Sequence, residues 1–273
     1  MTTELEAALA AVDGWGTAHA AVALVDRDGV IADHGDPDRI FRWASVTKLA
    51  TALAVLTAID DGSIDLDDPA GPPASTVRHL LAHASGLPFE GKAPIAAPGT
   101  RRVYSNEGFR VLGAHLEQRA EMPFAEYVRA AVVEPLGIEL DPTGDPGSGM
   151  RASLADVLAL ARELLHPTVV APETLDELTA VQFPGLAGVL PDWGRFEPLD
   201  WGLGVQLATS PPTWMGSRVT RRAFGHFGGS GTFLWVDPEP GLACAALTDR
   251  EFGDWAKEAW PALSDAVVEE AAG

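Results

Sequence analysis

Strand-like segments lie at both ends of the chain and helical segments lie between them, and this distribution constrains the fold more than any other feature. Residues 21–25 and 30–32 are apolar runs on either side of the turn Asp26-Arg27-Asp28-Gly29, which is typical of a β-hairpin. Further candidate strands follow beyond residue 200, at 202–207, 219–226, 231–236 and 243–248. We therefore expect a mixed α/β fold in which both chain ends build one mainly antiparallel sheet flanked by helices.

The middle of the chain has helical patterning that prolines interrupt. From Ser45 to about Asp60 the sequence is rich in Ala and Leu and lacks Gly and Pro, which predicts a buried helix. Six prolines between residues 65 and 100 limit any helix there to a short piece. Helices are also predicted at 76–83, at 105–133 in two pieces divided near Pro123, from Ser153 to about Leu165, and at 253–271.

This order of elements predicts two lobes. Residues 1–44 together with about 168–273 are expected to form the sheet-containing lobe. Residues from about 45 to 167 are expected to form an inserted, mostly helical lobe, with the active site in the cleft between the two.

Composition excludes several classes of partner. The 273 residues are 47% hydrophobic, which is enough for a substantial core. Asp and Glu number 39 against 19 Lys and Arg, a formal charge of −20 that repels nucleic acids and anionic membranes. The charge does not name the substrate, and the composition leaves the oligomeric state open.

Two further features concern the compartment. Cys244 is the only cysteine, so the chain can form no internal disulfide, and its apolar surroundings predict a buried structural thiol. The N-terminus has no basic region followed by an apolar stretch, and no apolar run approaches the ~18–20 residues of a membrane span. We therefore expect a cytoplasmic protein without a membrane segment.

The segment Ser45-Val46-Thr47-Lys48 places a hydroxyl and an amine three residues apart. On a helix these two side chains lie on one face within reach of each other. A buried lysine has a lowered pKa, because desolvation disfavours the ammonium form, and it can then serve as a base for the serine. The alternative is a capping serine beside a lysine that extends to solvent.

Two other segments carry polar groups or glycines in positions that favour a site. Tyr104-Ser105-Asn106 follows Pro98-Gly99-Thr100 and precedes a predicted helix, so a loop can present a phenol and an amide. His226-Phe227-Gly228-Gly229-Ser230-Gly231 leads into a strand, where glycines allow a ligand to approach the backbone. A capped helix start and a sharp turn between strands are the structural alternatives.

The order Ser-x-x-Lys, Tyr-x-Asn, His-x-Gly resembles the serine β-lactamase and penicillin-binding protein superfamily. The resemblance is to its class C-like branch, which includes family VIII carboxylesterases and D-alanyl-D-alanine carboxypeptidases. It covers about residues 18–250, and connecting segments of the chain are similar to that family too, at residues 80–88, 98–100, 201–204 and 233–238.

The resemblance implies a β-lactamase/transpeptidase-like fold and a serine hydrolase that works without a cofactor through an acyl-enzyme. It implies that Ser45 is the nucleophile and that Lys48 and Tyr104 transfer protons. The backbone N–H groups of Ser45 and Gly229 would form the oxyanion hole. The substrate-binding positions implied by the resemblance are Asn106, on the acyl side, His226 and Gly228.

His226 stands where many β-lactamases have a lysine, so a fixed cation for a β-lactam carboxylate is missing or depends on pH. This departure favours small esters as substrates. A β-lactamase and a D-amino-acid amidase or peptidase of the same family remain alternatives. So does a binding or sensor module that acylates slowly, because a fold alone does not establish turnover.

Three further patterns in the sequence have other possible interpretations. His79 and His83 have the spacing of zinc ligands on a helix, but no third ligand is evident, so no metal is expected. Residues 228–232 nearly match the nucleophile elbow of α/β-hydrolases, yet Thr232 replaces the final glycine. The last interpretation concerns tryptophans that either line an apolar pocket or belong to the core, namely Trp193, Trp201 and Trp214.

Overall fold

The computed structural model describes residues 2–209 and 214–272. Within these residues the largest sheet has six strands in the order β2-β1-β11-β10-β9-β8, and every neighbouring pair is antiparallel. The strands are β1 (Ala20–Val25), β2 (Val30–Gly35), β8 (Gln206–Leu207), β9 (Phe224–Gly228), β10 (Thr232–Asp237) and β11 (Leu242–Thr248). Because β1 pairs with β11, with Ala23 opposite Ala245, the two chain ends meet in one sheet as predicted.

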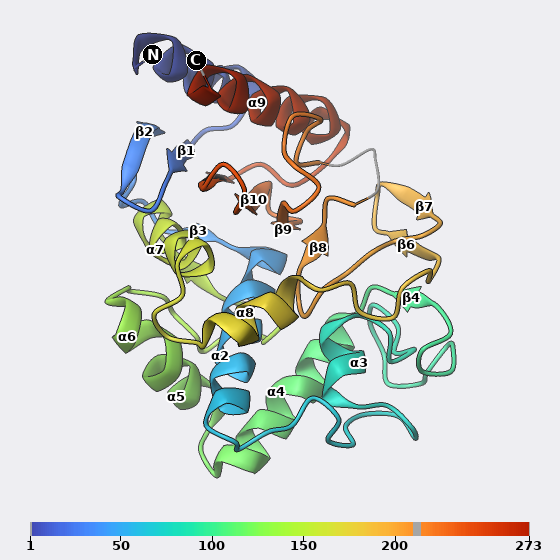
Figure 1. The fold of residues 1–273 in the computed structure, drawn as a ribbon. Coiled ribbons are helices and arrows are strands. Elements are labelled where there is room, and N and C mark those ends of the chain that lie inside the picture. The colour runs from blue at the N-terminus through green and yellow to red at the C-terminus, as the bar shows by residue number, and fades with distance from the viewer. Residues whose placement is uncertain (1, 210–213, 273) are drawn as a thin grey trace.

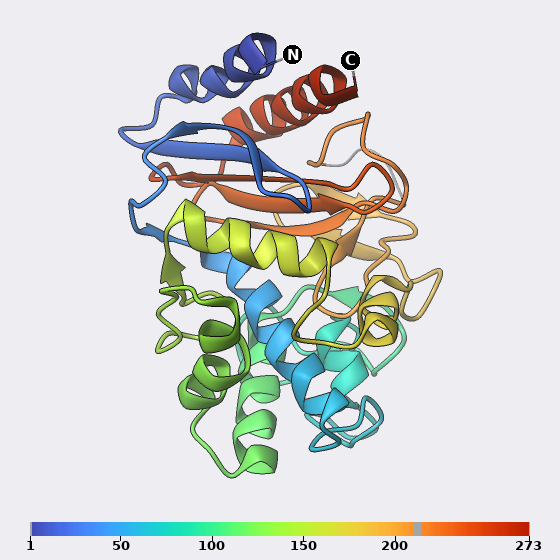
Figure 2. The same cartoon turned by 60° about the vertical axis from the view of Figure 1, so that its left-hand side comes forward.

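Helices cover both faces of this sheet (Figures 1 and 2). Side chains alternate along β1, so Val22 and Leu24 pack with the terminal helices while Ala21, Ala23 and Val25 face the rest of the core. Figure 2 shows the terminal helices on one side of the sheet and α7 on the other. The helices on the two faces are α1 (Thr2–Leu9) and α9 (Asp254–Ala272) on the first, and α2 (Thr47–Asp60) and α7 (Leu154–Leu165) on the second.

The start of α7 follows directly from the local sequence. The Ser153 hydroxyl accepts a hydrogen bond from the Asp156 N–H, and the Asp156 carboxylate accepts one from the Ser153 N–H. This reciprocal capping satisfies backbone donors that a helix start leaves unpaired. The helix then ends at Leu165, as predicted.

Most of the remaining helices gather around α2 in the lower half of Figure 1, among them α3 (Val77–Leu81), α4 (Asn106–Ala120), α5 (Phe124–Val128) and α6 (Glu134–Leu136). The pattern predicted for residues 105–133 divides at Pro123, and a π-helical turn (Arg129–Val133) follows its second piece. The other helical segments are η1 (Ala10–Trp15), η2 (Ala44–Val46) and α8 (Pro172–Thr179). The division into two lobes stays a prediction.

Two predicted strands are shorter than expected. Residues 202–205 form a turn, in which the Gly202 N–H donates to the carbonyl of Val205 over 2.9 Å. Gly204 has φ +81° there, a value that favours glycine, so only residues 206–207 join the sheet. The strand expected at 219–226 instead spans Phe224–Gly228. Five short strands were not predicted, namely β3 (Phe41–Arg42), β4 (Arg102–Val103), β5 (Arg151–Ala152), β6 (Gly188–Leu190) and β7 (Gly194–Phe196).

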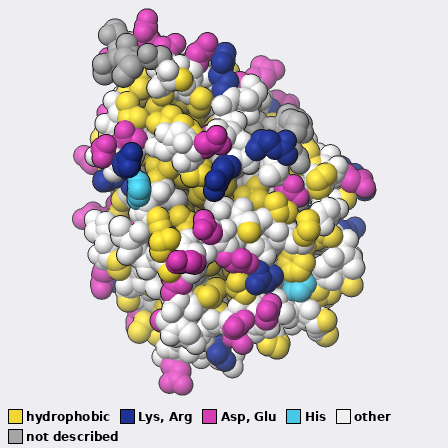
Figure 3. Space-filling model, in the orientation of Figure 1, with side chains coloured by type: hydrophobic (Ala, Val, Ile, Leu, Met, Phe, Trp, Pro, Cys, Tyr) yellow, Lys and Arg dark blue, Asp and Glu magenta, His cyan; other side chains and the backbone are white. Residues whose placement is uncertain are grey.

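Burial and surface charge agree with the composition. Cys244 lies in β11 with no exposed surface, and burial raises the pKa of its thiol, so the predicted buried thiol is confirmed. On the face seen in Figure 3, acidic side chains are spread over the surface with basic ones between them. Among the described residues, no helix combines the length and apolar character needed to cross a bilayer.

Candidate active site

Ser45 and Lys48 meet where α2 begins. Ser45 belongs to the 3₁₀ turn η2 and Lys48 to the first turn of α2. Because residues three apart share a helix face, the Lys48 Nζ comes within 3.2 Å of the Ser45 Oγ. Ser45 is half-buried, whereas the Lys48 side chain is completely buried. The lysine therefore does not extend to solvent.

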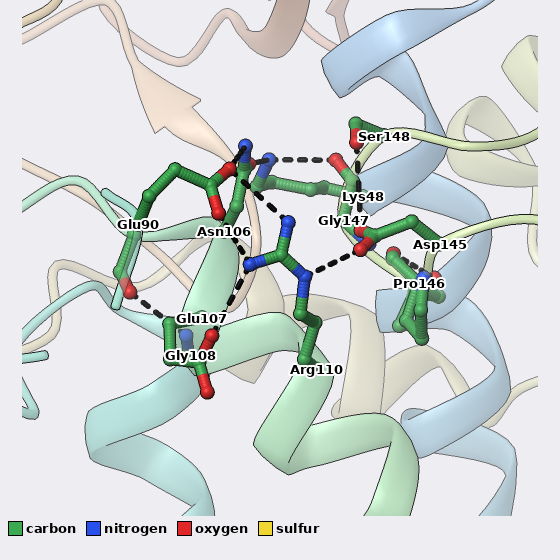
Figure 4. Close-up of polar contacts among 12 residues, drawn as sticks. Lys48, Glu90, Asn106, Glu107, Gly108, Arg110, Asp145, Pro146, Gly147 and Ser148 are labelled. Carbon is green, nitrogen blue, oxygen red and sulfur yellow. Dashed lines mark hydrogen bonds and ion pairs between the residues drawn. The ribbon is translucent and has the colours of Figure 1, made fainter. Parts of the chain in front are cut away.

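The Lys48 amine has two further partners, which Figure 4 shows around it. Its Nζ donates to the Asn106 Oδ1 and to the backbone carbonyl of Gly147, each over 2.7 Å. Burial lowers the pKa of Lys48 to about 7, Asp145 opposes this shift and Arg110 reinforces it. A substantial fraction of the amine is then neutral near neutral pH.

Tyr104 lies between β4 and α4, beside the same amine. Its ring centroid is 4.9 Å from the Lys48 Nζ. Burial raises the pKa of the phenol well above its ordinary value, and a hydrogen bond with Ser45 opposes that shift only in part. Tyr104 is therefore a neutral phenol at physiological pH, able to donate a proton rather than standing ready as a base.

His83 fixes Tyr104, a function that the sequence analysis did not assign to it. Its carbonyl accepts a hydrogen bond from the Val103 N–H over 2.8 Å, and its Nδ1 accepts one from the Ser105 N–H over 3.1 Å. Its ring also packs against the Tyr104 ring, with the centroids 4.5 Å apart and the ring planes tilted by 37°. One histidine thus holds the backbone on both sides of Tyr104 and the ring between them.

Gly228 allows strand β9 to approach the turn before Ser45. A Cβ at Gly228 would lie 2.4 Å from the carbonyl oxygen of Trp43 and 3.1 Å from the Cβ of Ala44, so any other residue would force the two segments apart. The Thr232 hydroxyl also donates to the Trp43 carbonyl over 2.9 Å. These contacts bring the glycine-rich segment against the serine turn.

Gly229, the next residue after Gly228, faces open space. A Cβ there would meet no atom within 4 Å, which indicates free space in front of the residue. Neither the Gly229 N–H nor the Ser45 N–H donates a backbone hydrogen bond to any residue within 2–209 and 214–272. Two unengaged N–H groups are what an oxyanion hole requires, and that role stays a prediction.

His226 lies on β9 and is almost completely buried. Its Nδ1 is 2.7 Å from the carbonyl oxygen of Phe227, which requires the Nδ1–H tautomer, and its Nε2 has no partner among the described residues. Burial, reinforced by the charge of Lys48, lowers the pKa of His226 to about 3. The imidazole is therefore uncharged at neutral pH.

The structure brings Ser45, Lys48, Tyr104 and Asn106 together. His226 also contacts the tyrosine, with their ring centroids 5.8 Å apart. Asn106 is engaged at both ends, because its Nδ2 also donates to a carboxylate of Glu90 over 3.3 Å. The catalytic and substrate-binding roles assigned to these residues stay predictions.

A pocket of 350 Å³ opens beside Tyr104, with mostly apolar walls to which Arg101, Arg102 and Arg195 also contribute. Phe89, Ile95 and Val189 line it, and their exposed fractions of 47%, 57% and 57% are high for large apolar side chains. The tryptophans considered in the sequence analysis do not line this pocket. Trp201 and Trp214 are buried in the core, and Trp193 packs partly buried beside them.

The two histidines with metal-ligand spacing have other contacts. The His79 Nδ1 is 2.9 Å from the Thr76 hydroxyl, and the His83 Nδ1 accepts from the Ser105 N–H. Across residues 2–209 and 214–272, no group of three or more His, Cys, Asp and Glu is arranged to hold a metal ion.

Residues 7–268 match the family model described as Beta-lactamase. The chain is 33% identical to Esterase EstB of Burkholderia gladioli, with 90% of each chain covered. It is 29% identical to the D-alanyl-D-alanine-carboxypeptidase/endopeptidase AmpH of Escherichia coli K12, over 40% of this chain and 38% of that protein.

A solved structure titled as a β-lactamase from Mycobacterium bovis superposes with a TM-score of 0.93 and is 47% identical over 97% of this chain and 99% of that one. The chain belongs to the β-lactamase family of serine hydrolases. Family, mixed α/β fold and hydrolase class, all expected from the sequence, are confirmed. Small molecules are the substrates that such an enzyme acts on.

Proposed function

We propose that the protein is a carboxylesterase that forms an acyl-enzyme on Ser45. The observation that carries the proposal is the position of the Lys48 amine. Its two carbonyl partners, on Asn106 and Gly147, accept hydrogen bonds but cannot donate them. Both N–H bonds of a neutral amine are thereby used, and its lone pair is left facing the Ser45 hydroxyl, which makes Lys48 a base aimed at the nucleophile.

The acylation step follows from this arrangement. The Ser45 Oγ attacks the ester carbonyl carbon while its proton passes to Lys48, and the N–H groups of Ser45 and Gly229 stabilise the developing oxyanion. As the C–O bond of the ester breaks, the neutral phenol of Tyr104 donates its proton to the leaving alkoxide and regains one from Lys48. Water then attacks the acyl carbon and gives up a proton to the same groups. The bond between the acyl carbon and the Ser45 Oγ breaks, the Oγ receives that proton, and the carboxylic acid leaves.

Two features of the site favour esters. The pocket beside Tyr104 is lined by exposed apolar side chains as well as by three arginines, and its apolar part suits the hydrocarbon part of an ester. The uncharged His226 offers no cation to the carboxylate that a β-lactam carries. The likeness to Esterase EstB over 90% of both chains also supports this class of substrate.

A β-lactamase is the second candidate, and the 47% identity to the structure titled as a β-lactamase favours it. A D-amino-acid amidase or peptidase is a third member of the same class, supported by the likeness to AmpH. A binding or sensor module that acylates slowly differs from all of these in lacking turnover. Cytoplasmic location and the two-lobe division, with the site in the cleft between the lobes, are further parts of the proposal.

The test is a substrate panel run with the wild-type protein and Ser45→Ala. The panel contains p-nitrophenyl butyrate, a D-amino-acid amide and a cephalosporin. We expect the ester to give the highest kcat/KM and Ser45→Ala to abolish its turnover. Cephalosporin hydrolysis with equal or higher kcat/KM would replace the esterase assignment with a β-lactamase, and acylation without turnover of any substrate would indicate a sensor.

A further inference from the structure

Arg110, on the second turn of α4, gathers three carboxylates beside the proposed active site (Figure 4). Its Nη1 and Nη2 atoms bind the two carboxylate oxygens of Glu90 over 2.5 and 3.1 Å. Its Nε donates to the Asp145 Oδ2 over 2.5 Å, and its Nη1 also donates to Glu107 over 3.1 Å. The planar guanidinium thus fixes carboxylates from two separate loops in one arrangement.

Two of these carboxylates also hold the oxygen atoms that accept from Lys48. Glu90 accepts a hydrogen bond from the Asn106 Nδ2 over 3.3 Å, and the Asn106 Oδ1 faces the lysine amine. Asp145 Oδ1 accepts one from the Gly147 N–H over 2.8 Å, and the Gly147 carbonyl faces the same amine. Each acceptor of Lys48 is therefore held from behind by a carboxylate.

We propose that Arg110 is a positioning residue that holds the two hydrogen-bond acceptors of the Lys48 amine through Glu90 and Asp145. Two series of hydrogen bonds connect the guanidinium to the Lys48 Nζ, one through Glu90 and one through Asp145. If either series is broken, the acceptor at its end can move, and the lone pair of the amine no longer points steadily at the Ser45 hydroxyl. The proposal rests on the role of Lys48 as the base in the proposed function.

The same residues set the charge around the lysine. Arg110 lowers the pKa of Lys48, while Asp145 and Glu90 raise it. Glu107 is held by Arg110 on the side of α4, and hydrogen bonding to its carboxylate partners raises the pKa of Arg110, which stays charged. The other titratable groups that face the amine are uncharged at neutral pH, namely the Tyr104 phenol and the imidazoles of His83 and His226.

Substitutions of opposite charge test this arrangement. The measurement is the pH dependence of kcat/KM for p-nitrophenyl butyrate, whose acid limb reports the pKa of the base in the free enzyme. Arg110→Gln removes a positive charge, which raises the pKa of Lys48, so the midpoint of the acid limb should move to higher pH. Asp145→Asn removes a negative charge, which lowers the pKa of Lys48, so the midpoint should move to lower pH. The asparagine keeps an oxygen that can accept from the Gly147 N–H. We expect shifts of about half a unit or more.

Arg110→Lys separates charge from geometry. It keeps the positive charge but loses the fork that binds two oxygens of Glu90 together with Asp145. The midpoint should stay close to that of the wild type, while kcat falls by roughly tenfold or more because the acceptors are no longer held. A change in stability alone would not produce this combination.

Arg119→Gln is the matched control, on the same helix and with the same change in net charge. Arg119 pairs with Asp68 over 3.5 Å and donates to the Ser63 carbonyl over 2.9 Å, away from the lysine. Its profile and kcat should match the wild type.

A kcat of Arg110→Lys equal to that of the wild type would overturn the positioning role. Midpoints of Arg110→Gln and Asp145→Asn that equal the wild type, or that move in the same direction, would overturn the proposal as well. If Arg110→Gln does not fold, Arg110→Lys tests the positioning and the nearly isosteric Asp145→Asn tests the charge. Ester hydrolysis that persists in Ser45→Ala would instead refute the proposed function, so the two failures are distinguishable.

Discussion

The Lys48 Nζ lies 3.2 Å from the Ser45 Oγ, and the lysine side chain has no exposed surface. Two carbonyl oxygens, from Asn106 and Gly147, surround the rest of the amine. This combination explains how an amine that is ordinarily protonated can act on a serine hydroxyl. Burial favours the neutral form, and the two acceptors determine which way its lone pair points.

The first prediction concerns pH. Because burial lowers the pKa of Lys48 to about 7, the neutral and active form increases as pH rises through that value. The kcat/KM for p-nitrophenyl butyrate should therefore rise about tenfold per pH unit below the midpoint and level off above it. Rates are corrected for spontaneous hydrolysis. A profile that is flat between about pH 5.5 and about pH 8.5 would contradict the role of Lys48 as the base.

The second prediction concerns Tyr104→Phe. The ring remains to pack against His83, but the proton donor for the leaving group is lost, so kcat should fall by about 10²–10⁴ while KM changes little. Tyr127→Phe is the matched control, because Tyr127 is the other tyrosine and its hydroxyl bonds to Asp61 over 3.3 Å. A loss below about fivefold in Tyr104→Phe would assign the proton transfer to another group.

Local signals account for the parts of the fold that the sequence predicted. The end of α2 at Asp60 and the capping of α7 by Ser153 and Asp156 depend on residues close in the chain. By contrast, residues 202–205 are apolar like a strand but form a turn around Gly204, which lies against the carbonyl of Leu81. That contact is tertiary, and no local pattern predicts it.

The same distinction applies to the site. Ser45 and Lys48 are three residues apart and could be paired from helix geometry alone. Two of the three carboxylate partners of Arg110 are 20 and 35 residues away, at Glu90 and Asp145, in loops whose positions only the folded chain defines. His83 lay in a segment used for the family resemblance, yet its contact with Tyr104 needs two loops to meet.

The third prediction concerns His226→Lys. Burial would lower the pKa of a lysine amine on β9 as it lowers that of Lys48, but a bound β-lactam carboxylate would favour the protonated form. The resulting charge-assisted hydrogen bond is worth ~1–3 kcal/mol, so the ratio of cephalosporin acylation to ester hydrolysis should rise about tenfold or more. His226→Gln is the neutral control and should leave the ratio unchanged. An unchanged ratio in His226→Lys would show that substrate choice is made elsewhere, for example in the apolar pocket beside Tyr104.

The central claim, that Ser45 is the nucleophile, is tested most directly by covalent labelling. The wild-type protein and Ser45→Ala are treated with a fluorophosphonate, and intact masses and digested peptides are compared by mass spectrometry. We predict the addition of one phosphonyl group to the wild type, located on the peptide that contains Ser45, and no addition to Ser45→Ala. Equal labelling of Ser45→Ala, or a label on a different residue of the wild type, would contradict the account.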